Sequence, residues 1–544
     1  MNFVYRFAAG RAALGLATVW SLATVWSLAL ATTATAAPPT ELNRITTHHE
    51  NVLGTFLELT VVTSQPDHGP QIEQTVLDEI ERLRQIFSTY DAQSELSRWQ
   101  TSHGPQTVSA ELLEVMQLTD RWRSLSNGAF HPSTGAVAQL WKTASQTGRE
   151  IDRNALRQTV DQLRQPAWRL DPTRRSAERL SELPVDFNGI ATGYIIDRAG
   201  QLALQTHPSL SGLLINIGGD LRAFGDLETD VHIARPDADA ENSPPLASIR
   251  LRHRALTTSG SYRRGVDVQG VHHSHILDPR TGQPADTIAS ATVIAATATD
   301  ADALATICCV LSPADSLSLI DQLPGTACLL VTADGKQLTS RDWTQVAPPA
   351  TRTVAAQQAQ GADERTGTAG GGGAASTGDG SWSEQFELGV NFEVQRSGDA
   401  RGYRRPYVAV WLEDADEFPV RTLALWLQTD GPGPRWHPDL RRWYRNDRVR
   451  KLVDGRELIG TVSAATRPAG KYKLVWDGHD DQGQPVAPGK YTLYLEVARE
   501  HGTYQLMQTE VEVGGAQPTD EKNLEGNVEI KGATVAYRRR TPKN

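Results

Sequence analysis

The sequence predicts an α+β protein with two folded parts, a mixed body over about residues 41–346 and a β-sandwich module over about 382–515. A chain of 544 residues is too long for one hydrophobic core. In the body, helical and strand-like apolar patterns follow one another irregularly, without the repeating β–α order of a doubly wound sheet. In the second part, short β-branched and aromatic runs alternate with turn-forming clusters, which is typical of a sandwich.

The first 37 residues have the pattern of a cleaved secretory signal peptide. Arg6 and Arg11 are the only charged residues before Glu41, an apolar run follows them, and "ATA" at 34–36 matches an A-x-A cleavage site. The apolar run is also long enough to span a bilayer, so an uncleaved membrane anchor is the alternative. Both readings predict a periplasmic or other extracytoplasmic location.

The body contains clear helical and strand patterns. "HGPQIEQTVLDEIERLRQIFSTY" and "SAELLEVMQLTDRWRSLS" have helical spacing of apolar residues. "LGTFLELTVVT", "GLLINIGGDLRAFG" and "ASATVIAATA" predict strands. Gly189 and Gly193 bracket the entry into a further helix, and the turns at 218–220 and 257–261 are rich in glycine and serine. Such turns let the backbone approach a ligand closely.

A candidate metal site lies in "ATDADALATICCVL", which predicts a helix beginning after Thr299 or Asp300. Asp302 and Thr306 stand four residues apart and therefore on one helical face. A carboxylate and a hydroxyl near glycine turns suit a hard cation such as Mg²⁺, which prefers oxygen ligands. The alternative is a helix N-terminus that carries an aspartate for its favourable interaction with the helix dipole.

Composition excludes some classes of function. The formal net charge of −10 argues against binding nucleic acid through its phosphates. Cys308, Cys309 and Cys328 lie in apolar surroundings, which predicts buried small side chains, with one bridge to Cys328 as the alternative.

The remaining segments complete the domain plan. Residues 347–381 have the Gly, Ala, Ser and Thr bias of a flexible linker. In the module, Asp477, Asp480 and Asp481 predict a structural turn, because their spacing differs from that of a calcium-binding EF-hand. Residues 516–544 read as a polar tail that contains one terminal strand, "VEIKGATVAY".

Eight segments of the body, in this order, resemble the FAD:protein FMN transferases, also called the ApbE family. The resemblance spans about 50–345 and rests on "LGTFLELTV", "FSTYDAQSELSRW", "SNGAFHPSTGAVAQLW", "DFNGIATGYIID", "LLINIGGDLRAFG", "TTSGSYRR", "HILDPRTGQP" and "ATVIAATATDADALAT". It implies a mixed body with a largely antiparallel sheet. The second module resembles a domain of unknown function found fused to this family, with the Ig-like character of flagellar hook-cap modules.

The resemblance implies an activity and its components. Family members cleave FAD, attach FMN through a phosphoester to a Thr or Ser of a target protein and release AMP, with Mg²⁺ as cofactor. The implied partner is an acceptor flavoprotein, which we expect to be a membrane-associated redox protein. FAD hydrolysis to FMN and AMP is one alternative, and a non-catalytic flavin-binding or scaffold protein is another.

The resemblance also assigns residues. His275 becomes the catalytic base, since imidazole titrates near neutral pH. Asp302, Thr306 and the carbonyl of Gly189 become the metal ligands. The positions associated with FAD are Leu53, Tyr90, Ala129, Phe130, His131, Asp186, Thr192 and Ile276. His272 and His273 are expected to be exposed strand residues.

Three positions depart from the family pattern. Leu53 replaces the usual methionine, His131 replaces an aspartate, and Thr192 replaces a lysine. The last two together remove one anion and one cation from the implied site. In the tail, Thr534 lies in a Gly-Ala-Thr that resembles the acceptor motif, but we expect a plain strand there because no acceptor domain surrounds it.

Overall fold

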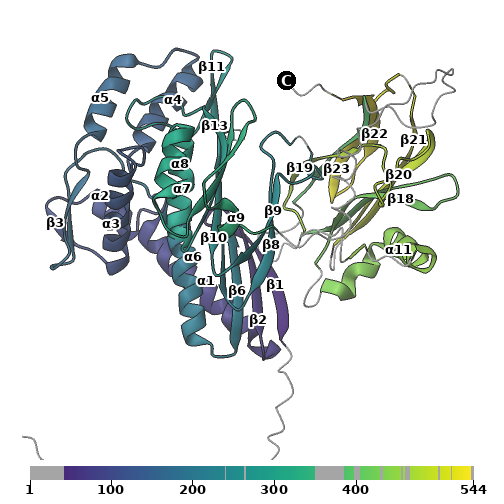
Figure 1. The fold of residues 1–544 in the computed structure, drawn as a ribbon, viewed down its shortest axis with the longest axis horizontal. Coiled ribbons are helices and arrows are strands. Elements are labelled where there is room, and N and C mark those ends of the chain that lie inside the picture. Colours follow the sequence, from purple (N-terminus) through teal and green to yellow (C-terminus); the bar gives the residue numbers. More distant parts are fainter. Residues whose placement is uncertain are drawn as a thin grey trace, which may run out of the picture. The chain divides into compact units, whose positions relative to one another are not determined.

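The computed structural model describes residues 42–238, 240–261, 265–349, 385–396, 405–428, 433–454, 458–459, 466–499, 503–515 and 517–540. The predicted signal peptide and all but the first three residues of the predicted linker lie outside them. The body mixes helices and strands and the C-terminal part is strand-rich, which confirms the α+β class (Figure 1). Within these residues, no helix combines the length and apolar character needed to cross a bilayer.

An eight-stranded sheet forms the centre of the body. Its order is β1 (Asn43–Val52), β2 (Thr55–Thr63), β6 (Leu210–Ile217), β7 (Asp220–Gly225), β10 (Ala255–Gly260), β13 (Ile288–Ala295), β14 (Ala327–Thr332) and β15 (Gln337–Thr339). Every neighbouring pair is antiparallel. The predicted antiparallel character of the sheet is therefore confirmed.

Side chains alternate between the two faces of this sheet. On one face, Leu213 and Ile215 join the main hydrophobic core with helices α1 (Gly69–Phe87), α6 (Ala191–Thr206) and α7 (Ala298–Val310). On the other face, Leu214 belongs to a second core with residues of β9 (Ala247–Arg252) and α9 (Trp343–Val346). Strand β9 pairs with β8 (Glu228–Ile233). The central sheet is thus covered on both sides.

Local sequence explains the helices of the main core. Helix α1 buries Ile72, Val76, Ile80 and Leu83, as the spacing predicts. Helix α3 (Ala110–Leu125) confirms the second predicted helix. Helix α7 begins slightly earlier than expected because the Thr297 hydroxyl caps it, accepting from the Asp300 amide at 3.1 Å.

The three cysteines are buried and free, two of them on α7 and one on β14. This agrees with their predicted role as small core side chains.

The smaller elements of the body gather around its edges. They are η1 (Pro66–His68), α2 (Glu95–Gln100), α4 (Gly135–Thr147), α5 (Arg153–Leu163), α8 (Pro313–Asp321), the three-stranded sheet β3 (Pro105–Thr107), β5 (Ser176–Arg179) and β4 (Trp168–Asp171), and the hairpin β11 (Gly265–Val268) with β12 (Val271–Ser274). In Figure 1, α4, α5 and β11 lie at the same end of the body. A separate hydrophobic cluster joins these three elements.

The C-terminal part is a β-sandwich, as predicted. One sheet has the order β19 (Gly470–Trp476), β16 (Phe386–Val394), β23 (Ile530–Arg539) and β22 (Lys522–Glu525). The other has the order β18 (Pro419–Trp426), β17 (Tyr407–Glu413), β20 (Gly489–Ala498) and β21 (Tyr504–Val513). One hydrophobic cluster contains side chains from both sheets.

Two features of the sandwich differ from the sequence expectation. The expected module end at residue 515 is too early, because β22 and β23 lie in the segment read as a polar tail, and Ile530, Val535 and Tyr537 are buried. Helix α11 (Arg441–Asp454), preceded by η2 (Gly433–Asp439), has no apolar pattern that predicts it. Its first turn is held by Glu496, which accepts from the amides of Arg442 and Trp443 at 2.8 Å.

The expected strand and turn are both present. Thr534 lies in β23, where its hydroxyl is 3.2 Å from the amide nitrogen of the Asn391 side chain. The Asp480 side chain accepts two backbone amides within its own turn, and that of Asp481 accepts the Thr422 amide at 2.9 Å. These contacts tie the carboxylates to the fold.

Candidate active site

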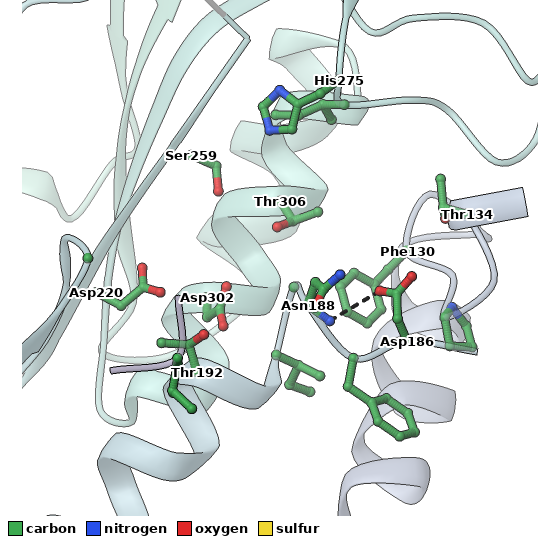
Figure 2. A pocket seen from close by; sticks show the side chains of 18 of the residues that line it. Phe130, Thr134, Asp186, Asn188, Thr192, Asp220, Ser259, His275, Asp302 and Thr306 are labelled. Atoms are coloured by element: carbon green, nitrogen blue, oxygen red, sulfur yellow. Dashed lines mark hydrogen bonds between the residues drawn. The ribbon is translucent and has the colours of Figure 1, made fainter. Parts of the chain in front are cut away.

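A cavity of about 800 Å³ opens at the point where α6, α7 and several turns meet (Figure 2). Its walls come from six stretches of the body: 53–55, 130–138, 186–192, 217–220, 258–260 and 275–277. Tyr90, Thr119, and Asp302 and Thr306 of α7 complete it. Eleven of the twelve residues assigned from the sequence line this single cavity. The exception, Ala129, is buried and does not reach the wall.

Glycine at position 193 brings the beginnings of α6 and α7 together. A Cβ atom there would overlap the Ala298 carbonyl and lie 2.7 Å from the Thr299 nitrogen. The buried Asp197 side chain reinforces the contact, because it accepts from the amides of Ala298 and Thr299 at 2.9 Å. The close approach of the two helices therefore depends on Gly193 and Asp197 of α6.

Helix α6 begins at the cavity without a side-chain cap. Its N-cap residue, Ile190, has φ −153° and supplies no capping oxygen. Gly189, Ile190 and Thr192 all line the cavity. Three amides at this end already have acceptors, since those of Ile190 and Ala191 donate to the Phe187 carbonyl and that of Gly193 donates to Asp302. The positive end of the helix dipole still attracts anions such as phosphate.

The predicted metal ligands lie close together. A Cβ atom on Gly189 would be 3.2 Å from Thr306 Oγ1, so the Gly189 backbone and the Thr306 hydroxyl are neighbours. Asp302, one helical turn before Thr306, is 5% exposed and accepts the Gly193 amide at 3.3 Å. Figure 2 shows Asp302, Thr306 and then His275 following one another along the cavity.

A second carboxylate, that of Asp220, faces Asp302 in Figure 2. Burial, followed by the negative charge of Asp220, raises the pKa of Asp302 well above its ordinary range. Burial raises the pKa of Asp220 to about 6. Neither side chain forms an ion pair with a described basic residue. Two such carboxylates beside a hydroxyl and a carbonyl fit a divalent cation, which offsets the cost of burying their charges.

The loop around residue 186 closes another side of the cavity. Burial raises the pKa of Asp186, whose Oδ1 accepts the Asn188 amide at 3.2 Å. The Asp186 amide in turn donates to the Pro132 carbonyl at 2.8 Å. A Cβ atom on Gly135 would lie 2.9 Å from Asp186 Oδ2, so glycine leaves room for this carboxylate.

His131 forms a local backbone contact of the kind that an aspartate side chain can form. Its Nδ1 accepts the Ser133 amide at 3.0 Å, two residues further along the chain, as an aspartate does in an Asx turn. Burial, followed by the positive charge of Arg123, lowers the pKa of His131 to about 4. The imidazole is therefore neutral at pH 7, so it supplies no positive charge to the cavity.

Two further predicted residues occupy the cavity rim. His275 is exposed and follows directly after β12. Tyr90 is 94% exposed, so it does not cover a ring face in this structure, whereas Phe130 is 6% exposed and packs near Gly189.

Of the two histidines before His275, His272 is exposed as expected, and the ring of His273 packs against Trp141 with centroids 4.6 Å apart.

The sequence assignment missed several lining residues. Asp220, Ser259, Asn188 and Thr134 all line the cavity. The sequence did carry a signal for Asp220 and Ser259. Both lie in glycine-containing turns of the kind that let the backbone approach a ligand closely. Which side chains of those turns face the cavity depends on how β7 and β10 pair, and that pairing is not visible in the sequence.

Comparisons with known proteins identify the family of the body. A family profile described as "ApbE family" matches residues 53–330, and one described as "Predicted periplasmic protein (DUF2271)" matches residues 387–532. The FAD:protein FMN transferase of Treponema pallidum is 28% identical over 307 residues, which cover 52% of this chain and 84% of that protein. The FAD:protein FMN transferase of Vibrio cholerae is 30% identical over 249 residues, which cover 43% and 71%. The solved structure of the ApbE protein of Thermotoga maritima is 27% identical, covers 56% of this chain and 99% of its own, and has a TM-score of 0.49.

Proposed function

Because the chain belongs to the ApbE family, we propose that it is an FAD:protein FMN transferase that acts outside the cytoplasm. Its substrates are FAD and a protein with an acceptor Thr or Ser, and its products are AMP and the FMN-modified protein. The observation that carries this proposal is the convergence of Asp302, Thr306, Gly189 and His275 on one cavity. The relatives that match the body are named for this activity.

The residues present fit a Mg²⁺ ion. Asp302 and Thr306 would hold it, together with the Gly189 carbonyl. When bound, the ion stabilises the negative charge that develops on the pyrophosphate. The negative charge of Asp220 raises the pKa of Asp302, so a bound cation would relieve the repulsion between the two carboxylates.

The remaining residues orient FAD and move a proton. The positive end of the α6 dipole, which lines the cavity, attracts the phosphates. His275 accepts the proton of the acceptor hydroxyl. The hydroxyl oxygen then bonds to the phosphorus of the FMN half, the pyrophosphate P–O bond breaks, and AMP leaves with the bridging oxygen.

The location outside the cytoplasm has two independent supports. The N-terminal segment has the features of a signal peptide, and the second module matches a family described as periplasmic. We propose that the acceptor is a redox flavoprotein at the outer side of the cytoplasmic membrane.

One experiment tests the activity and separates it from its hydrolytic alternative. The full chain is incubated with FAD, Mg²⁺ and a Thr-bearing acceptor polypeptide, and AMP and acceptor mass are followed together. A transferase releases AMP and raises the acceptor mass by one FMN. Release of AMP with free FMN and no mass increase identifies a hydrolase, and no AMP release contradicts both activities.

A further inference from the structure

A second cavity lies on the far side of the segment that carries His275. Its volume is about 690 Å³, and its walls come from α4, α5, the β11–β12 hairpin and the turn that follows His275. We call it the arginine groove, after the side chains of Arg153, Arg157, Arg164 and Arg280 that line it.

The two cavities share one wall, the segment 273–283. His275, Ile276 and Leu277 line the first cavity, whereas His273, Arg280 and Gln283 line the arginine groove. The turn is rigid, because Asp278 accepts the Arg280 amide at 2.9 Å and its carbonyl accepts the Gly282 amide at 2.7 Å. A molecule in the groove therefore lies beside the segment that carries the proposed base.

The groove is positively charged in a protein that is acidic overall. Its lining contains four arginines and only two acidic residues, Glu150 and Asp161. Arg280 is paired with Asp278 at 2.8 Å and Arg164 with Asp161 at 2.9 Å. Arg153 and Arg157, one turn apart on α5, are exposed, and their side chains form no hydrogen bond or ion pair with the described residues.

Apolar surface lies between these charges. Trp141, whose indole nitrogen donates to the Gly282 carbonyl at 2.9 Å, contributes to the lining with Leu156 and Val160 of α5. Val271, on the edge of the hairpin, is 57% exposed. A long mixed surface of this kind suits an extended polypeptide, which presents both charged and apolar side chains.

We propose that the arginine groove docks the acceptor polypeptide through acidic side chains that flank its Thr or Ser. This inference rests on the proposed function, since it names the charge of that reaction's protein substrate. FAD occupies the first cavity and the acceptor approaches His275 from the groove. Arg153 and Arg157 attract the acidic residues, and the apolar lining holds the backbone between them.

The test uses three synthetic peptides of equal length with one central Thr, flanked by Asp and Glu, by Asn and Gln, or by Lys. Binding to the full chain is measured by fluorescence anisotropy at low and high salt. We expect the acidic peptide to bind most tightly, with an affinity that falls as salt rises. The double variant Arg153→Ala/Arg157→Ala should weaken its binding by about fivefold or more.

A matched control is Arg174→Ala, since this arginine is also exposed but lies in the β4–β5 turn, outside the groove. It should leave peptide binding unchanged. Equal affinity of the acidic and neutral peptides, or full affinity in the double variant, overturns the proposal. Thermal unfolding of the double variant verifies that it is folded, and Gln at both positions provides a second variant that keeps the side-chain length.

A turnover measurement separates this inference from the proposed function. With FAD and Mg²⁺ present, the ratio of FMN-peptide to free FMN is measured for the acidic peptide. The ratio should fall in the double variant and stay unchanged in Arg174→Ala. Charge-dependent binding without any AMP release leaves the docking surface supported and contradicts the proposed function, whereas an unchanged ratio in the double variant contradicts the docking surface alone.

Discussion

The Gly193 amide on α6 donates to the buried carboxylate of Asp302 on α7. This contact joins the beginning of α6, which lines the cavity, with the helix that carries the proposed metal ligands. It exists only because residue 193 lacks a Cβ atom, which would overlap the Ala298 carbonyl.

Gly193→Ala should therefore damage both stability and activity. Separating α6 from α7 should cost about 1–3 kcal/mol of unfolding free energy, the usual cost of overpacking a core. AMP release should fall further than stability alone explains, because Asp302 moves. Denaturant unfolding and AMP assays measure the two effects. Gly489→Ala is the control, since a Cβ atom there meets no other atom within 4 Å.

The two metal-binding side chains should differ in importance. Asp302→Ala removes a charged ligand and should abolish Mg²⁺-dependent AMP release. Thr306→Ala removes a neutral oxygen, so its activity should be restored in part by excess Mg²⁺. Titration of each variant with Mg²⁺ checks this order. Equal losses in both variants, without rescue of either, would contradict the assignment.

His275→Ala should separate proton transfer from binding. FAD and Mg²⁺ affinities should stay close to those of the unmodified protein, while transfer slows by roughly 10²–10⁴-fold, the usual contribution of a general base. Flavin fluorescence titration and transfer rates at saturating FAD supply the data. If FAD affinity is lost but turnover at saturation is retained, His275 is a binding residue.

Thr192→Lys should tighten FAD binding. Among the described residues that line the first cavity there is no Lys or Arg, so no side chain with a permanent positive charge is available there for the FAD phosphates. A lysine at the beginning of α6 adds a positive charge at this point. Fluorescence titration should show a severalfold lower Kd and a weaker dependence on Mg²⁺. Thr192→Met, similar in length but uncharged, should show neither.

His131 should make stability depend on pH. Its pKa is about 4 in the fold against about 6.5 when unfolded, so the unfolded chain binds the extra proton between these values. Stability should therefore decrease as pH falls from 6.5 to 4, by on the order of 2–3 kcal/mol in total. His131→Asn can still accept the Ser133 amide but does not titrate. Denaturant unfolding at pH 4, 5, 6 and 7 should show a smaller pH dependence in this variant.

Features that depend on residues close in sequence could be predicted. The spacing of Ile72, Val76 and Ile80 predicted α1, and the four-residue separation of Asp302 and Thr306 predicted their shared face. The resemblance to the family identified His275 and Gly189. Their sequence spacing does not predict that they lie near α7, because they are far from it along the chain.

Features that depend on strand pairing or on buried charge could not be predicted from the sequence. Asp220 reaches the cavity because β7 pairs with β10, and nothing local in the sequence states that pairing. Helix α11 escaped detection because charged side chains fix it: the Arg442 guanidinium contacts the buried Glu413 at 2.6 Å. Strand β23 was expected only as a strand within a polar tail, because its pairing with β16 joins residues far apart in the sequence.

The position of β23 imposes an order on the assembly of the sandwich. This last strand lies between β16, the first strand of the module, and β22. A chain that emerges N-terminus first during synthesis or export therefore exposes one edge of β16 until residues 530–539 have appeared. A premature stop codon before residue 530 would leave that edge permanently open to pairing with other chains. Residues 530–539 thus protect the module against aggregation.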